Sequence, residues 1–144
     1  MMTGQLKYSL VLAAVLIGLF VIGNLISSSP HTLGVFPWLI NLVAFPIVLY
    51  PAIRDISIRH YGASLTIYQG LWIGEAITRW AALLFGVFYA CYSYFYFEHG
   101  RLWLLIAGFI MTVLTTWLIG LMCSFVCTFV ITKRLPSDKA SPAA

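Results

Sequence analysis

Four long apolar runs occupy most of this chain and constrain its fold more than any other feature. They cover about residues 8–26, 33–53, 71–97 and 102–132. Each run can supply the roughly 18 to 20 residues that a helix needs to cross the hydrocarbon of a bilayer. Lipid cannot hydrogen-bond a backbone, and the runs lack the period-two alternation of barrel strands, so we predict four transmembrane helices.

Composition supports the same class of protein. Hydrophobic residues make up 62% of the chain and charged residues 8%, whereas charges make up roughly a quarter of a typical soluble domain. A soluble chain would need charged residues over most of its exterior. We therefore predict an all-α polytopic membrane bundle over residues 1–134. The polar tail at 135–144 is too poor in apolar residues to fold alone.

The distribution of Lys and Arg predicts the orientation of the bundle. If the runs cross the membrane in alternation, Arg101 lies on one side and the other basic residues near the span ends lie on the opposite side, which the positive-inside rule makes cytoplasmic. Both termini are then cytoplasmic. The formal net charge of +4 predicts attraction to anionic inner-leaflet headgroups and no nucleic-acid patch. The cytoplasmic basic residues are Lys7, Arg54, Arg59, Lys133, Arg134 and Lys139.

The connections between the runs predict how the helices follow one another. Residues 54–69 form the longest connector, which we expect to lie along the headgroups. Within it, Thr66 and Gln69 have the spacing of a capping box, so the third helix is predicted to begin near Ile67. The short connection at 98–101 predicts that the third and fourth helices form a tight antiparallel hairpin. In the second run, Pro46 predicts a kink.

Small residues recur at every fourth position in the third and fourth runs. Such rows let membrane helices approach closely. Because a four-residue step rotates about 40° around a helix, one partner can use some three or four members of a row. The remainder are then available to another helix or subunit. The third run carries Gly70, Gly74, Thr78, Ala82, Gly86 and Ala90, and the fourth carries Gly108, Thr112, Thr116, Gly120, Ser124 and Thr128.

Glu75 and Arg79 are the charged residues embedded in an apolar run, and their i,i+4 spacing places them on one helical face. A helix that begins near Ile67 would place Glu75 at headgroup depth, where a structural ion pair is inexpensive. We favour that interpretation. The alternative is a transport site of a proton- or cation-coupled transporter or channel, in which Asn41 of the kinked second run takes part.

Aromatic side chains gather at the outer end of the third run. Their amphipathic rings suit the membrane interface, so we favour an interfacial belt over a stacking platform for a ligand. The residues concerned are Phe88, Tyr89, Tyr92, Tyr94, Phe95, Tyr96 and Phe97.

No catalytic, cofactor or metal pattern is recognisable in the sequence. Cys123 and Cys127 share a helical face but lack neighbouring His or carboxylate ligands, and His31 and His99 have no metal-ligand spacing. Phosphate-binding loops, nucleophile motifs and carboxylate dyads are likewise missing from the sequence. We therefore predict a non-enzymatic protein without a cofactor.

The segment that enters the third run carries an arginine–aspartate pair, a glycine-containing connector and a glutamine–glycine step. Its residues are Arg54, Asp55, Gly62, Thr66, Gln69, Gly70 and Gly74. This pattern resembles a family of small bacterial four-helix membrane proteins classed as a domain of unknown function. The resemblance implies a multi-pass protein of the bacterial cytoplasmic membrane, and it brings no activity or site residue.

Two functional hypotheses follow from these patterns. The leading one is an accessory or structural membrane subunit that packs through its small-residue faces against itself or a larger membrane complex. Its rival is the small transporter or channel that uses Glu75, Arg79 and Asn41. A membrane enzyme is the third and least supported possibility, because the sequence does not place paired polar groups at a shared depth in the membrane.

Overall fold

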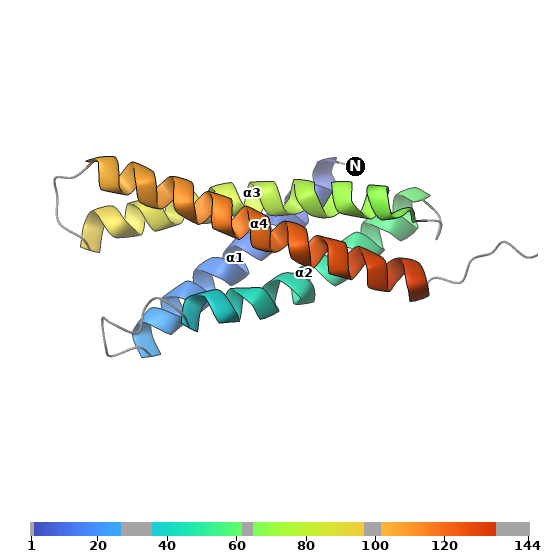
Figure 1. The fold of residues 1–144 in the computed structure, drawn as a ribbon, viewed down its shortest axis with the longest axis horizontal. Coiled ribbons are helices and arrows are strands. Elements are labelled where there is room, and N and C mark those ends of the chain that lie inside the picture. The colour runs from blue at the N-terminus through green and yellow to red at the C-terminus, as the bar shows by residue number, and fades with distance from the viewer. Residues whose placement is uncertain (1, 27–35, 62–64, 97–101, 135–144) are drawn as a thin grey trace, which may run out of the picture.

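The structure, a computed structural model, describes residues 2–26, 36–61, 65–96 and 102–134. These residues form four helices, α1 (Met2–Ile26), α2 (Phe36–Tyr61), α3 (Ile67–Tyr96) and α4 (Leu102–Arg134) (Figure 1). The all-α prediction is confirmed. The predicted polar tail and the short connection at 98–101 lie outside the described residues.

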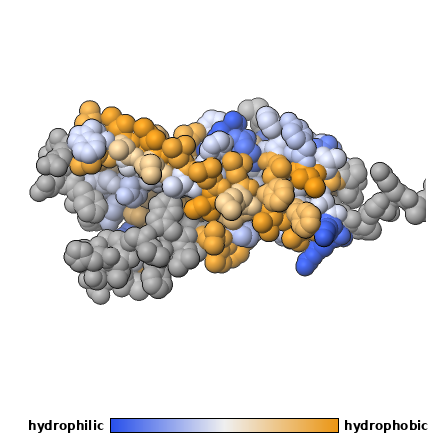
Figure 2. Space-filling view, in the orientation of Figure 1, coloured by the Kyte–Doolittle hydropathy of each residue, from blue (hydrophilic) through white to orange (hydrophobic). Residues whose placement is uncertain are grey.

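Three of the four helices contain segments long and apolar enough to cross a bilayer. The segments are Gly4–Leu25 in α1, Ile67–Phe95 in α3 and Leu102–Arg134 in α4. The second half of α2 carries Arg54, Asp55 and Arg59, and no such segment is found among its described residues. Hydrophobic residues lie along much of the face that α4 presents in Figure 2. The chain is a multi-pass helical membrane protein.

The helices form two pairs of unequal tightness. α3 and α4 run antiparallel and make the most extensive contact in the structure, so the predicted close packing of these two helices is confirmed (Figure 1). α1 packs against α2 and α3, and α2 also packs against α4. Among the described residues, α1 and α4 do not meet. In Figure 1 the α1–α2 pair spreads away from the hairpin toward the end where α3 stops and α4 starts.

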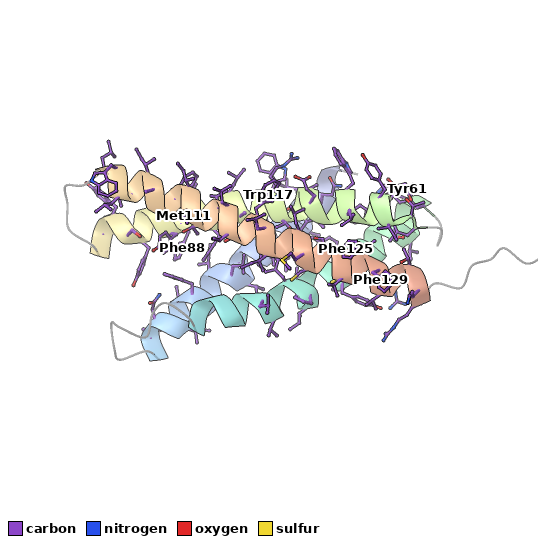
Figure 3. The ribbon with its side chains drawn as sticks, viewed as in Figure 1. Tyr61, Phe88, Met111, Trp117, Phe125 and Phe129 are labelled. Carbon is purple, nitrogen blue, oxygen red and sulfur yellow. The ribbon has the colours of Figure 1, made fainter. Side chains whose placement is uncertain are left out.

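The apolar core lies where α1 and α2 meet the hairpin. Its largest fully buried apolar side chains are Leu12, Leu16, Phe45, Leu49, Ile53, Ile73, Ile77 and Ile131. α4 buries mainly small and hydroxyl-bearing residues, while its large side chains Met111, Phe125 and Phe129 are exposed (Figure 3). This inverted arrangement suits a helix that contacts its neighbours through a groove and faces lipid with its bulk.

α2 is longer than the sequence indicated. The connector expected from Arg54 is helical through Tyr61, eight residues past Ile53. The charges of Arg54 and Asp55 end an apolar run, but they do not interrupt backbone hydrogen bonding, so the helix continues beyond the apolar segment. Pro46 and Pro51 both lie inside α2, and Figure 1 shows the helix changing direction along its length.

The predicted start of α3 is confirmed in atomic detail. The Thr66 backbone N–H donates to Gln69 Oε1 at 3.0 Å, and the Gln69 N–H donates to Thr66 Oγ1 at 3.3 Å. This reciprocal pair is the capping box, which satisfies two backbone donors that would otherwise lack acceptors. Ile67 is accordingly the first residue of α3.

Part of the predicted aromatic belt packs inside the molecule. Phe20 of α1 contacts the rings of Phe85, Phe88, Tyr89 and Tyr92, each edge to face, at centroid distances between 5.1 and 6.0 Å. Such pairs contribute about 0.5–1.5 kcal/mol each beyond the area they bury. The cluster fixes α1 against the C-terminal half of α3. Tyr94 and Phe95 are exposed beyond it, as an interfacial belt requires.

Candidate functional site

The two rows of small residues face each other along the α3–α4 contact, which we call the seam. A methyl group built on Gly70 would collide with Thr128, one on Gly74 with Ser124, and one on Gly120 with Thr78. The partners are equally far from the turn: Gly74 lies 22 residues before Tyr96, and Ser124 lies 22 after Leu102. The contacts are therefore symmetric about the residues between Tyr96 and Leu102, and at these three levels a glycine of one helix lies against a small side chain of the other.

The rows separate toward the end of the hairpin where α3 stops and α4 starts. A methyl group on Gly86 would meet Val113 Cγ2 at 2.5 Å and the Phe109 ring, neither of which belongs to a row. A methyl group on Gly108 would lie at an ordinary van der Waals distance, 3.5 Å, from the Tyr89 ring. This drift is the rotation expected of rows with a four-residue repeat. Among the other row members, Ala82, Thr112 and Thr116 are buried and Ala90 is half-buried.

Helix α2 closes the seam from one side. Ile53 Cδ1 would lie 3.4 Å from a methyl group on Gly74, and Phe45 Cε1 2.8 Å from one on Gly120. Thr78 is therefore enclosed where three helices converge. Within the described residues the buried hydroxyls of Thr78, Thr116 and Thr128 make no hydrogen bond, whereas Ser124 donates to the Gly120 carbonyl at 2.7 Å.

The seam also fixes the level of Glu75 and Arg79 in the bundle. Thr78, which directly precedes Arg79, lies against Gly120, and Gly120 stands 18 residues after Leu102 and 14 before Arg134. At 1.5 Å per residue these separations are about 27 Å and about 21 Å. Arg79 therefore lies beside the middle of α4, whereas Glu75, which follows Gly74 at the level of Ser124, lies about 15 Å from the end of α4. The headgroup depth that the sequence predicts for Glu75 stays a prediction, because these separations fix its level against α4 and not against a bilayer.

Glu75 and Arg79 form an ion pair on the outside of the bundle. Arg79 Nη1 lies 3.7 Å from Glu75 Oε1, as the i,i+4 spacing predicted. The Arg79 side chain is 53% exposed and that of Glu75 is 21% exposed. Large exposed side chains surround the pair on α3, namely Tyr68, Trp72, Trp80 and Leu83. Charged residues in membrane helices ordinarily face the bundle interior, so this placement is unusual.

The structure describes no contact that joins Asn41, the third residue of the transport hypothesis, to the Glu75–Arg79 pair. Asn41 lies in α2, and its side chain falls outside the described part of the structure. Pro46, at the predicted kink, is exposed.

A second polar cluster joins α1 to α2 at the opposite end of α2 from Asn41. The Tyr8 hydroxyl donates to Asp55 Oδ2 at 2.9 Å, and Arg59 Nε donates to Asp55 Oδ1 at 2.9 Å. These two hydrogen bonds hold the pKa of Asp55 below its ordinary value, because both stabilise the ionised carboxylate. The sequence identified Arg54 and Asp55 as a pattern but missed Tyr8, since 47 residues separate the two partners.

The described residues contain no cluster of three His, Cys, Asp or Glu side chains placed to hold a metal ion. Comparisons with family models, curated proteins and solved structures found no match to the chain. The resemblance to the bacterial four-helix family therefore stays a prediction from the residues that carry it.

Proposed function

We propose that the chain is a non-enzymatic, four-span subunit of a bacterial cytoplasmic membrane that packs against itself or a larger membrane complex. The supported class is a multi-pass helical membrane protein. We propose, beyond that class, the number of spans, the compartment and the role.

The length and position of α2 support a fourth span. Its 26 residues give a helix of about 39 Å, against roughly 30 Å of hydrocarbon. The Tyr8–Asp55 bond places the start of α1 beside the end of α2, and the Gly70–Thr128 contact places the start of α3 beside the end of α4. Lys7, Arg54, Arg59, Lys133 and Arg134 consequently gather at one end, as a cytoplasmic face requires.

One observation carries the proposed role as a subunit. Arg79 lies beside the middle of α4, Glu75 lies about one turn nearer to the end of α4, and the pair faces outward, where an isolated chain would present it to lipid. Charges at that depth cost several kcal/mol unless protein or water surrounds them. A neighbouring protein surface over α3 removes that cost. The small-residue rows give this proposal little support, because most of their members are buried within the chain itself.

The direct test is the state of assembly in a gentle environment. The protein is expressed at a low level, extracted in a mild detergent or in native lipid particles, and its mass is measured with lipids and partners retained. We expect an oligomer or a complex with another membrane protein. A stable single chain that binds no other protein would contradict the proposed role.

The same pair keeps a transporter or channel as the second candidate, because ionisable groups within membrane helices mark ion pathways in many membrane proteins. Proton flux into proteoliposomes, followed with a pH-sensitive dye, tests it. A transporter predicts a flux that Glu75→Gln abolishes. A flux that this substitution leaves unchanged would remove Glu75 from the mechanism, and liposomes without flux would argue against a proton pathway.

A further inference from the structure

We infer that two copies of this chain associate through the outer face of α3, with Arg79 of each copy paired to Glu75 of the other. The outer face of α3 is defined here by Tyr68, Trp72, Glu75, Arg79 and Leu83. This inference rests on the proposed role as a subunit and specifies the surface and the partner.

The ion pair within one chain leaves much of the Arg79 bonding capacity unused. A guanidinium carries five N–H donors, and the distance from Arg79 Nη1 to Glu75 Oε1 is 3.7 Å, longer than the 2.7–3.2 Å of a good N–H···O hydrogen bond. More than half of the Arg79 side chain is exposed. A second carboxylate can therefore approach the guanidinium without displacing Glu75.

The order of charges on this face is self-complementary. A two-fold axis along the membrane normal brings equal depths of two parallel helices together. Side chains on a helix lean toward its N-terminus, so the guanidinium of Arg79 extends from its own backbone position toward the depth of Glu75. In such a dimer each Arg79 reaches the partner's Glu75 as well as its own. The two acids and two bases then form a four-membered cluster without net charge.

The surroundings of the pair fit a protein surface better than a lipid headgroup. Arg79 directly follows Thr78, which contacts Gly120 about 21 Å from the cytoplasmic end of α4. A neutral pair does not select an anion such as a lipid phosphate. The exposed side chains of Trp72 and Leu83 offer apolar surface on either side of the charges. Among proteins, a second copy is the partner whose charges match this pattern by symmetry.

Cysteine cross-linking in native membranes locates the interface. The background chain carries Ala in place of Cys91, Cys123 and Cys127. Leu83→Cys lies on the outer face of α3, and the matched control Met122→Cys is a comparably large, exposed position on α4. We expect rapid disulfide-linked dimers for Leu83→Cys and a much smaller yield for Met122→Cys. Equal yields at both positions, or dimers through α4 alone, would overturn the inference.

Charge complementation tests the pairing itself. Glu75→Arg places two bases on the outer face of α3, and Arg79→Glu places two acids there. We expect each variant alone to lose at least about tenfold in self-association, the equivalent of 1.4 kcal/mol, because like charges then meet across the axis. Co-expression of the two variants with different tags should restore a mixed dimer. A purely intramolecular role for the pair predicts no such restoration by mixing.

One further variant distinguishes loss of dimerisation from loss of folding. The exchange of both residues in one chain, Glu75→Arg with Arg79→Glu, keeps opposite charges across the axis, although a base at position 75 leans away from an acid at position 79. This variant should dimerise more strongly than either single variant and less strongly than the unaltered chain. An exchange variant that dimerises no better than the single variants, while it remains as stable as the unaltered chain, would contradict the inference. A chain that assembles with a different protein but never cross-links through α3 would overturn the inference and leave the proposed subunit role standing. A single chain without partners would overturn both.

Discussion

Substitution of Gly120 by Ala tests the close approach of α3 and α4 that organises the bundle. The added methyl group would overlap Thr78 and lie 2.8 Å from Phe45 Cε1, and real Cβ atoms almost never show contacts under 3.0 Å. Overpacking of this kind costs about 1–3 kcal/mol, and the better helix propensity of Ala returns roughly 0.8–1.0 kcal/mol. We expect a net loss of up to about 2 kcal/mol in the free energy of unfolding, and of about 1–3 kcal/mol relative to a Gly→Ala change in open space.

Gly18→Ala is the matched control. Gly18 also lies inside a helix, α1, but a methyl group there meets nothing within 4 Å. This variant should therefore be neutral or up to about 1 kcal/mol more stable. Both variants are unfolded by titration with a denaturing detergent from a mild one, and tryptophan fluorescence reports the transition.

A double-mutant cycle identifies the contact that is responsible. Thr78→Ala removes the side-chain atoms that the new methyl group would strike, so in the Thr78→Ala background Gly120→Ala should cost less, by about 1 kcal/mol. Residual cost is expected because Phe45 remains in place. If Gly120→Ala proves as stable as Gly18→Ala, the helices do not touch at this level and the register of the hairpin is wrong.

Three other substitutions test the remaining contacts by the same unfolding titration. Thr66→Ala removes the capping box and should cost about 1 kcal/mol, whereas Thr132→Ala, an exposed threonine bonded to its own helix, should have little effect. Asp55→Asn should destabilise the chain at neutral pH and abolish a loss of stability on acidification. The folded-state pKa of Asp55 is lowered, so the contribution of its carboxylate to stability is present at neutral pH. That contribution disappears as the pH falls below about 4 and through the folded pKa. Phe20→Ala removes four ring contacts at once and should lower the stability by about 2–6 kcal/mol. A change below about 1 kcal/mol would show that the cluster does not hold α1.

The fold was predictable where local chemistry determines it. Apolar length predicted the helices, and the spacing of Thr66 and Gln69 predicted the first residue of α3. The extension of α2 through Tyr61 was missed because the charges of Arg54 and Asp55 ended the apolar run. A helix can nevertheless continue through charged residues beyond an apolar segment.

Alignment between helices was harder to predict than the helices themselves. A four-residue repeat indicates that two helices can approach, but it does not say which members meet. The missing information was the symmetry of the hairpin, which pairs residues at equal distances from its short connection, as Thr78 and Gly120 show. With that register, Arg79 lies beside the middle of α4, whereas the headgroup depth predicted for Glu75 stays a prediction.

The central claim is that all four helices cross the membrane and return the α2–α3 connection to the side that holds both termini. Single cysteines at Thr66, between α2 and α3, and at Leu102, the first residue of α4, test it in a background without Cys91, Cys123 and Cys127. The labelling reagent is a membrane-impermeant maleimide, applied to intact cells and to inverted vesicles. We predict that Leu102→Cys reacts in intact cells and Thr66→Cys only in inverted vesicles. Labelling of Thr66→Cys in intact cells would show that α2 does not return the chain to the cytoplasm and would contradict the four-span arrangement.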